Sequence, residues 1–148
     1  MDEKLKGYTP RILALILGIL LVFMEWFYVG WTTVYQFEAY PHAKDTQLLL
    51  ENTFFGLGLV TQITLASVKL KDTSTRYILQ LLLFLLLLNV HKGILEYIYR
   101  TNNPDIPMTS FLISQIGIVV LLTVLIGFLL RKWIKLPLFN NTQQSHLP

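Results

Sequence analysis

The sequence predicts an all-α integral membrane protein, a four-helix transmembrane up-down bundle with both termini in the cytoplasm. Of its 148 residues, 53% are hydrophobic and 14% are charged, whereas soluble domains carry about 25% charged residues. Four apolar stretches are long enough to cross the hydrocarbon core, which takes a helix of about 20 residues. The composition excludes a disordered chain. It does not favour a nucleic-acid-binding protein either, because the basic residues form no single patch.

The four predicted spans cover residues 12–35, 48–68, 77–99 and 108–130. The first span holds one charge, Glu25, and the second also holds one, Glu51. The third holds Lys92 and Glu96, and the fourth holds none. The connections are short, and we expect one membrane domain over the whole chain, with residues 140–148 as a flexible polar tail.

The basic residues predict the orientation of the helices, because lysine and arginine in short loops favour the cytoplasm. Nine of them lie in the N-terminal segment, the second loop and the C-terminal segment: Lys4, Lys6, Arg11, Lys69, Lys71, Arg76, Arg131, Lys132 and Lys135. Two, Lys44 and Arg100, lie in the first and third loops. We therefore expect a multi-pass protein of the cell membrane, with a prokaryotic inner membrane favoured over a eukaryotic one.

Charged residues inside a span are costly and indicate function. Their depth can be counted from the cytoplasmic end of each span at about 1.5 Å per residue. Glu25 then lies about 20 Å up, and Lys92 and Gln115 lie about 22 Å up. Glu51 and Glu96 come closer to the outer interface, at roughly 26–29 Å. The polar groups therefore gather in the outer half of the membrane.

Helical spacing places these polar residues on shared faces, such as Asn89, Lys92 and Glu96 on the third span. We expect such faces to line a polar crevice that opens to the outside. The candidate ligand-binding residues are Glu25, Tyr28, Glu51, Asn89, Lys92, Glu96 and Gln115.

A structural interpretation competes with this site: Glu25 and Lys92 could form a buried ion pair, or Lys92 could pair with Glu96 one turn on. His91 lies off the face of these residues, and a lone histidine there is more often hydrogen-bonded than a metal ligand. The sequence has no cysteine. We therefore predict no metal site and no cofactor.

No enzyme motif is present in the sequence, so catalytic residues stay unassigned. The favoured function is that of a small non-enzymatic membrane protein that binds an amphipathic ligand in the outer crevice or acts as an accessory subunit. One alternative is a proton-coupled small-molecule transporter using Glu25, and another is a membrane-embedded enzyme using the paired acids Glu25 and Glu51. The expected partners are the lipid bilayer and either the ligand or a membrane partner subunit, without nucleic acid. Homo-oligomer formation is left open.

Two families of small membrane proteins share features with this chain. The chain is similar to the small multidrug resistance exporters in carrying a glutamate in the first of four spans. The segment 23–27 around Glu25 departs from the pattern of those exporters. The segments 24–28 and 51–55 loosely resemble four-helix membrane proteins of the DoxX-like kind, whose polar residues also lie on the first two helices. Neither resemblance assigns the chain to a family, and no residue role is carried over.

Overall fold

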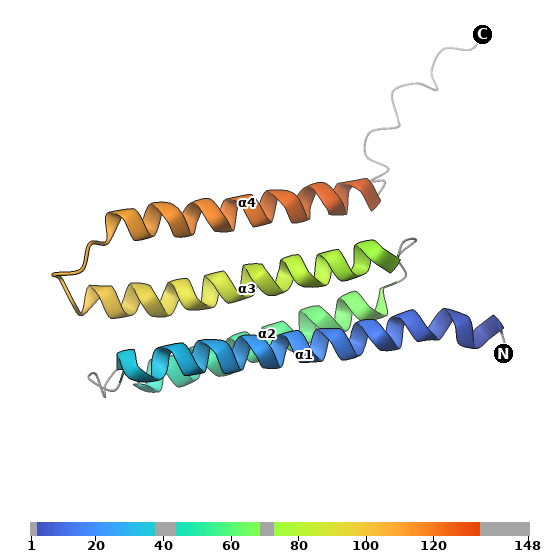
Figure 1. Ribbon diagram of the computed structural model, residues 1–148, viewed down its shortest axis with the longest axis horizontal. Coiled ribbons are helices and arrows are strands. Elements are labelled where there is room, and N and C mark those ends of the chain that lie inside the picture. Colours follow the sequence, from blue (N-terminus) through green and yellow to red (C-terminus); the bar gives the residue numbers. More distant parts are fainter. Residues whose placement is uncertain (1–2, 38–43, 69–72, 134–148) are drawn as a thin grey trace, which may run out of the picture.

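The protein is described by a computed structural model, which covers residues 3–37, 44–68 and 73–133. These residues form four α-helices: α1 (Glu3–Phe37), α2 (Lys44–Ser67), α3 (Thr73–Thr101) and α4 (Thr109–Trp133). Helix covers every predicted span to within one residue at its ends. Consecutive helices run in opposite directions, so the start of α1 and the end of α4 lie at the same end of the molecule (Figure 1). The predicted polar tail lies outside the described residues.

All four helices are long and apolar enough to cross a membrane, as expected of a multi-pass membrane protein. The outward surface of these helices is also rich in apolar side chains. On α4, the side chains of Ile113 and Phe128 are 69% and 71% exposed. Such a surface would be a liability in water, whereas acyl chains would cover it at no cost.

The helices form a three-helix unit with a fourth helix on its side, which is more open than the predicted bundle. α1, α2 and α3 each pack against the other two, while α4 packs chiefly on α3 (Figure 1). A small apolar cluster of Val29 and Leu95 joins α1 to α3. The core that positions the polar residues is therefore that of α1, α2 and α3.

Two glutamines in this core bind the backbone of neighbouring helices. Gln62 on α2 donates its side-chain amide to the carbonyl of Gln80 on α3, at 3.0 Å. Gln80 in turn donates to the carbonyl of Ala14 on α1, at 2.7 Å. Gly18 lies at this crossing, where an added Cβ would come within 2.8 Å of the Cβ of Gln62. The three helices can approach this closely because residue 18 has no side chain.

Arg76, in the first turn of α3, caps the C-terminal end of α2. Its guanidinium donates to the carbonyls of Ala66 and Val68, at 2.6 and 2.7 Å. The last carbonyls of a helix have no partner within the helix, and a buried carbonyl without a partner is costly. Arg76, 4% exposed, therefore satisfies α2 and ties it to α3.

The exposed hydroxyl groups of α2, the least apolar of the four helices, would be compatible with a lipid environment. Thr53, Thr64 and Ser67 are exposed, and each donates its hydroxyl to the carbonyl four residues earlier. A hydroxyl bonded within its own helix does not need water. These residues thus lower the hydropathy of α2 without leaving an unsatisfied donor.

The contact at Gly18 predicts the result of a pair of glycine substitutions. Gly18→Ala should destabilise the protein by about 1–3 kcal/mol, because overpacking a tight interface forces the surrounding helices apart. Gly127→Ala on α4 is the matched control, since nothing lies within 4 Å of its added Cβ. The control should be neutral or stabilising by up to about 1 kcal/mol, the helix propensity gained. Thermal unfolding in detergent compares the two, and equal effects would contradict the contact.

Candidate functional site

A buried contact between Glu25 of α1 and His91 of α3 is the centre of the three-helix unit. Nδ1 of His91 and Oε1 of Glu25 lie 2.6 Å apart. The side chains are 0% and 5% exposed. At this distance the two groups share one proton in a hydrogen bond, which is strong where one partner carries charge. The expectation that His91 is hydrogen-bonded is thus confirmed.

The imidazole of His91 is also held from the second helix. The ring of Phe54 on α2 stacks on it, with centroids 4.6 Å apart and planes 4° apart. All three helices therefore meet at His91. Its second nitrogen, Nε2, is buried and finds no hydrogen-bond partner among the described residues. A buried polar atom of this kind is costly, and such atoms are frequent at functional sites.

The structure replaces the predicted Glu25–Lys92 pair with the Glu25–His91 pair. Lys92 is one residue further along α3, so its side chain leaves the helix about 100° away from that of His91. Its Nζ lies 5.6 Å from the ring centroid of Tyr28, a half-exposed residue of α1. A long cationic side chain can reach an aromatic face or the interface. The less flexible histidine is the group that is buried.

Glu51, the second predicted acid, has surroundings of its own. It is 9% exposed and accepts a hydrogen bond from Nε2 of Gln47, one turn earlier on α2, at 2.9 Å. On α1 its carboxylate faces Gly30, where an added Cβ would lie 3.7 Å from Oε1. Because Gly30 lies five residues beyond Glu25, the two levels differ by about 7.5 Å along α1. Each acid thus has a different hydrogen-bond partner.

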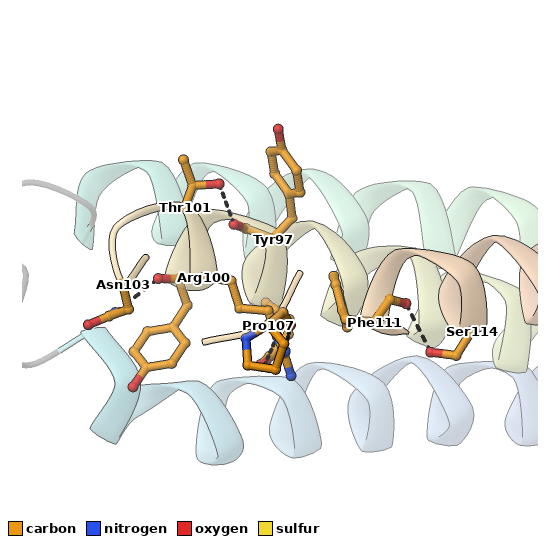
Figure 2. Close-up of polar contacts among 9 residues, drawn as sticks. Tyr97, Arg100, Thr101, Asn103, Pro107, Phe111 and Ser114 are labelled. Carbon is orange, nitrogen blue, oxygen red and sulfur yellow. Dashed lines mark hydrogen bonds and ion pairs between the residues drawn. The ribbon is translucent and has the colours of Figure 1, made fainter. Parts of the chain in front are cut away.

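Glu96 belongs to a polar cluster at the hairpin between α3 and α4. It accepts a hydrogen bond from Nε of Arg100, at 2.9 Å. The same guanidinium donates to the carbonyl of Pro107, at 2.6 Å, and lies over the ring of Phe111 at 4.7 Å. Figure 2 shows Arg100 reaching from the end of α3 to Pro107 and Phe111. This cluster fixes the hairpin ends of α3 and α4 relative to each other.

A groove of about 380 Å³ lies between α3 and α4. Its wall is mostly apolar and includes two of the predicted site residues, Asn89 and Gln115. The wall consists of Asn89, Val90, Gly93, Ile94, Tyr97, Phe111, Leu112, Gln115, Ile116, Val119 and Val120. This volume lies within the range of small-molecule sites, about 300–1,000 Å³.

The amide groups of the groove differ in how they are satisfied. Asn89 donates to the carbonyl of Leu85 in its own helix, at 2.8 Å. The Oε1 atom of Gln115 is buried and finds no hydrogen-bond partner among the described residues. It lies against Gly93, where an added Cβ would come within 3.2 Å of it. The groove therefore combines a long apolar wall with one unsatisfied amide oxygen.

The seven predicted site residues are thus distributed over separate places. Asn89 and Gln115 lie in the groove, and Glu25 lies in the three-helix core. Tyr28 and Lys92 contact each other, and Glu96 belongs to the hairpin. Glu51 packs between α1 and α2 with Gln47. The residues expected to line one outer crevice therefore lie in the lateral groove, in the buried pair and in three further contacts, Tyr28–Lys92, Glu96–Arg100 and Glu51–Gln47.

His91 was missed as a site residue although the sequence carries a signal for it. Residues 80, 84, 87, 91, 95 and 98 recur at steps of three and four and make up one face of α3. Gln80, His91 and Leu95 on this face are fully buried. The sequence prediction selects the more charged face of Asn89, Lys92 and Glu96 instead.

The chemistry of the buried pair is that of proton sharing. Glu25 and His91 can hold or pass a proton between Oε1 and Nδ1. In the described ranges, no group of three or more histidine, cysteine or acidic residues lies together as a metal site would require. Comparison with known proteins adds nothing to this assignment: no family model, curated protein or solved structure matches the chain.

The pair predicts a double-mutant cycle. Glu25→Leu should cost about 1–3 kcal/mol because it leaves both nitrogens of His91 buried without a partner, and His91→Phe should cost a similar amount because it strands the carboxylate. The double variant should recover about 1 kcal/mol or more, the upper range of such couplings in membranes. Unfolding in detergent by heat or denaturant measures the cycle.

Lys92→Met is the control for this cycle, because Lys92 contacts the Tyr28 ring instead of the pair. It should cost at most about 0.5–1 kcal/mol, the value of a cation–π contact at an exposed site. Its effect should add to that of Glu25→Leu without coupling. A coupling of Glu25 with Lys92 as large as that with His91 would contradict the assignment.

Proposed function

We propose that this protein binds an amphipathic small molecule in the groove between α3 and α4. The ligand would have one apolar chain and a small neutral head that donates a hydrogen bond, such as a hydroxyl. The observation that carries the proposal is Gln115, a residue of the mostly apolar wall whose Oε1 is buried against Gly93 and finds no hydrogen-bond partner among the described residues. This function is non-enzymatic and agrees with the function favoured by the sequence.

The shape and position of the groove support a lipid-like ligand. The groove is open along its side, so a molecule dissolved in the bilayer could enter without passing through water. Apolar residues such as Ile94 and Ile116 would contact its chain, while Gln115 would accept from its head. A buried amide oxygen gains most from a ligand that supplies the missing donor, because its cost in the free protein is relieved.

Proton-coupled transport is a second candidate, and the Glu25–His91 contact favours it. A carboxylate that shares a proton with a histidine inside the membrane can load and release that proton. In this case ligand release from the groove should change with protonation of the pair, and Glu25→Gln should abolish that dependence. In a simple binding protein or accessory subunit the affinity would not depend on Glu25.

The groove predicts the labelling pattern of a photo-activatable probe. A long-chain alcohol bearing a diazirine should crosslink to residues 89–97 and 111–120 in detergent or nanodiscs. Gln115→Leu should lower its affinity about 2- to 10-fold, because one hydrogen bond contributes about 0.5–1.5 kcal/mol. Mass spectrometry of the crosslinked peptides gives the site, and competition with unlabelled alcohol gives the affinity.

Two controls separate recognition of the head from burial of the chain. Ser114→Ala removes the neighbouring polar group of α4, whose hydroxyl donates to the carbonyl of Phe111 and is exposed (Figure 2). It should leave the affinity unchanged. The matching alkane probe should bind wild-type and Gln115→Leu equally. If Gln115→Leu lowers the affinity of both probes equally, Gln115 shapes the groove without binding the head group. That result would overturn the proposed ligand class.

We further propose that both termini are cytoplasmic, on the basis of the nine-to-two distribution of basic residues. Single cysteines at Lys44 and at Lys71 should then react differently with an impermeant thiol reagent added to intact cells. The cysteine at position 44 should be labelled from outside, and that at position 71 only after the cells are opened. The chain has no native cysteine, so each signal reports one position. The reverse pattern would invert the topology.

A further inference from the structure

A small cavity inside the three-helix unit lies next to the Glu25–His91 pair. Its wall includes Glu25 from α1, Phe54 and Gln62 from α2, and Leu87 from α3. The space amounts to about 10 Å³, and a site for one water needs about 10–15 Å³. The cavity is therefore of the size of a single water molecule and too small for any organic ligand.

The wall of this cavity carries the polar groups that a bound water requires. Oε1 of Gln62 is buried and finds no hydrogen-bond partner among the described residues. The Gln62 amide nitrogen donates to the Gln80 carbonyl, and this bond fixes which end of the amide is the acceptor. Glu25 engages His91 through Oε1, and a carboxylate has further acceptor sites on both oxygens. A water has two hydrogens to donate, one for each side chain.

We propose that this cavity is a binding site for one buried water, which donates to Gln62 Oε1 and to the carboxylate of Glu25. The water satisfies the Gln62 oxygen, whose burial would otherwise be costly. It also joins the Glu25–His91 pair to the glutamines Gln62 and Gln80 toward the inner half of the core. The buried pair thereby gains a polar neighbour with which its shared proton can exchange.

The site is spatially separate from the lateral groove, because it lies among α1, α2 and α3, whereas the groove lies between α3 and α4. Failure of the water site would leave the proposed ligand binding untouched, and the reverse also holds. Detection of the bound water therefore tests this site alone.

Two glycines of α2 provide a matched pair of variants. Gly58 lines the cavity, and an added Cβ there would lie 3.1 Å from a methyl of Val22, another residue of the wall. Gly58→Ala should therefore reduce the space, through the new methyl group or through the displaced Val22. Gly56, on the same helix, has nothing within 4 Å of an added Cβ. Gly56→Ala thus controls for the change in helix propensity.

The measurement is NMR of the labelled protein in lipid nanodiscs, which detects cross-peaks between a long-lived water and the side-chain amide protons of Gln62. Wild-type protein and Gly56→Ala should show the cross-peak, and Gly58→Ala should lose it. If Gly58→Ala fails to fold, Val22→Ile fills the same cavity by one methylene group and should lose the cross-peak instead. Absence of the cross-peak in wild-type protein, or its persistence in a folded cavity-filled variant, would overturn the proposal.

Discussion

The hydrogen bond between Glu25 and His91 is the interaction on which the arrangement of α1, α2 and α3 depends. Lipid tails are as apolar as leucine, so burial of apolar side chains gives these helices little reason to associate within a membrane. A carboxylate and an imidazole associate strongly there, because hydrocarbon offers no hydrogen-bond partner to either group. Their contact joins α1 to α3, and the stacked ring of Phe54 brings α2 to the same point. The contacts of Gln62, Gln80 and Arg76 follow the same principle closer to the end of the molecule where α3 begins.

The same constraint explains why α4 is bound differently. Its described side chains form no such polar link to the core; it packs on α3, and its contacts there include the amide of Gln115 against Gly93 and the ring of Phe111 under Arg100. Without a described side-chain hydrogen bond to draw them together, the two helices leave space between residues 89–97 and 111–120, and the groove occupies that space. The openness of the α3–α4 interface thus follows from the scarcity of polar contacts there. A ligand that donates a hydrogen bond to Gln115 would supply the donor that the described residues do not provide.

The sequence predicts the helices well and their pairing poorly, for a physical reason. Length and apolar composition suffice to define a span, because the bilayer imposes a minimum apolar length on every helix that crosses it. Pairing depends on which polar group is buried, and formal charge is a misleading guide to this. Lys92 carries charge but has a flexible side chain that can leave the core, as its position over Tyr28 illustrates. His91 can be neutral and is more rigid, so it can be buried at a lower cost than a permanent charge.

The two sites share helix α3, which gives the structure a route for coupling them. His91 and Leu95 face the three-helix core, while Gly93 and Tyr97 line the groove. Residues two positions apart on a helix point in nearly opposite directions, about 200° from one another. A shift of α3 that widens the groove for a ligand would therefore act on the distance between His91 and Glu25. Because linkage is reciprocal, a proton that strengthens or weakens this contact would change ligand affinity by the same factor. Proton-coupled transport requires such a coupling and simple binding does not, so the dependence of affinity on Glu25 separates the two functions more sharply than either site alone.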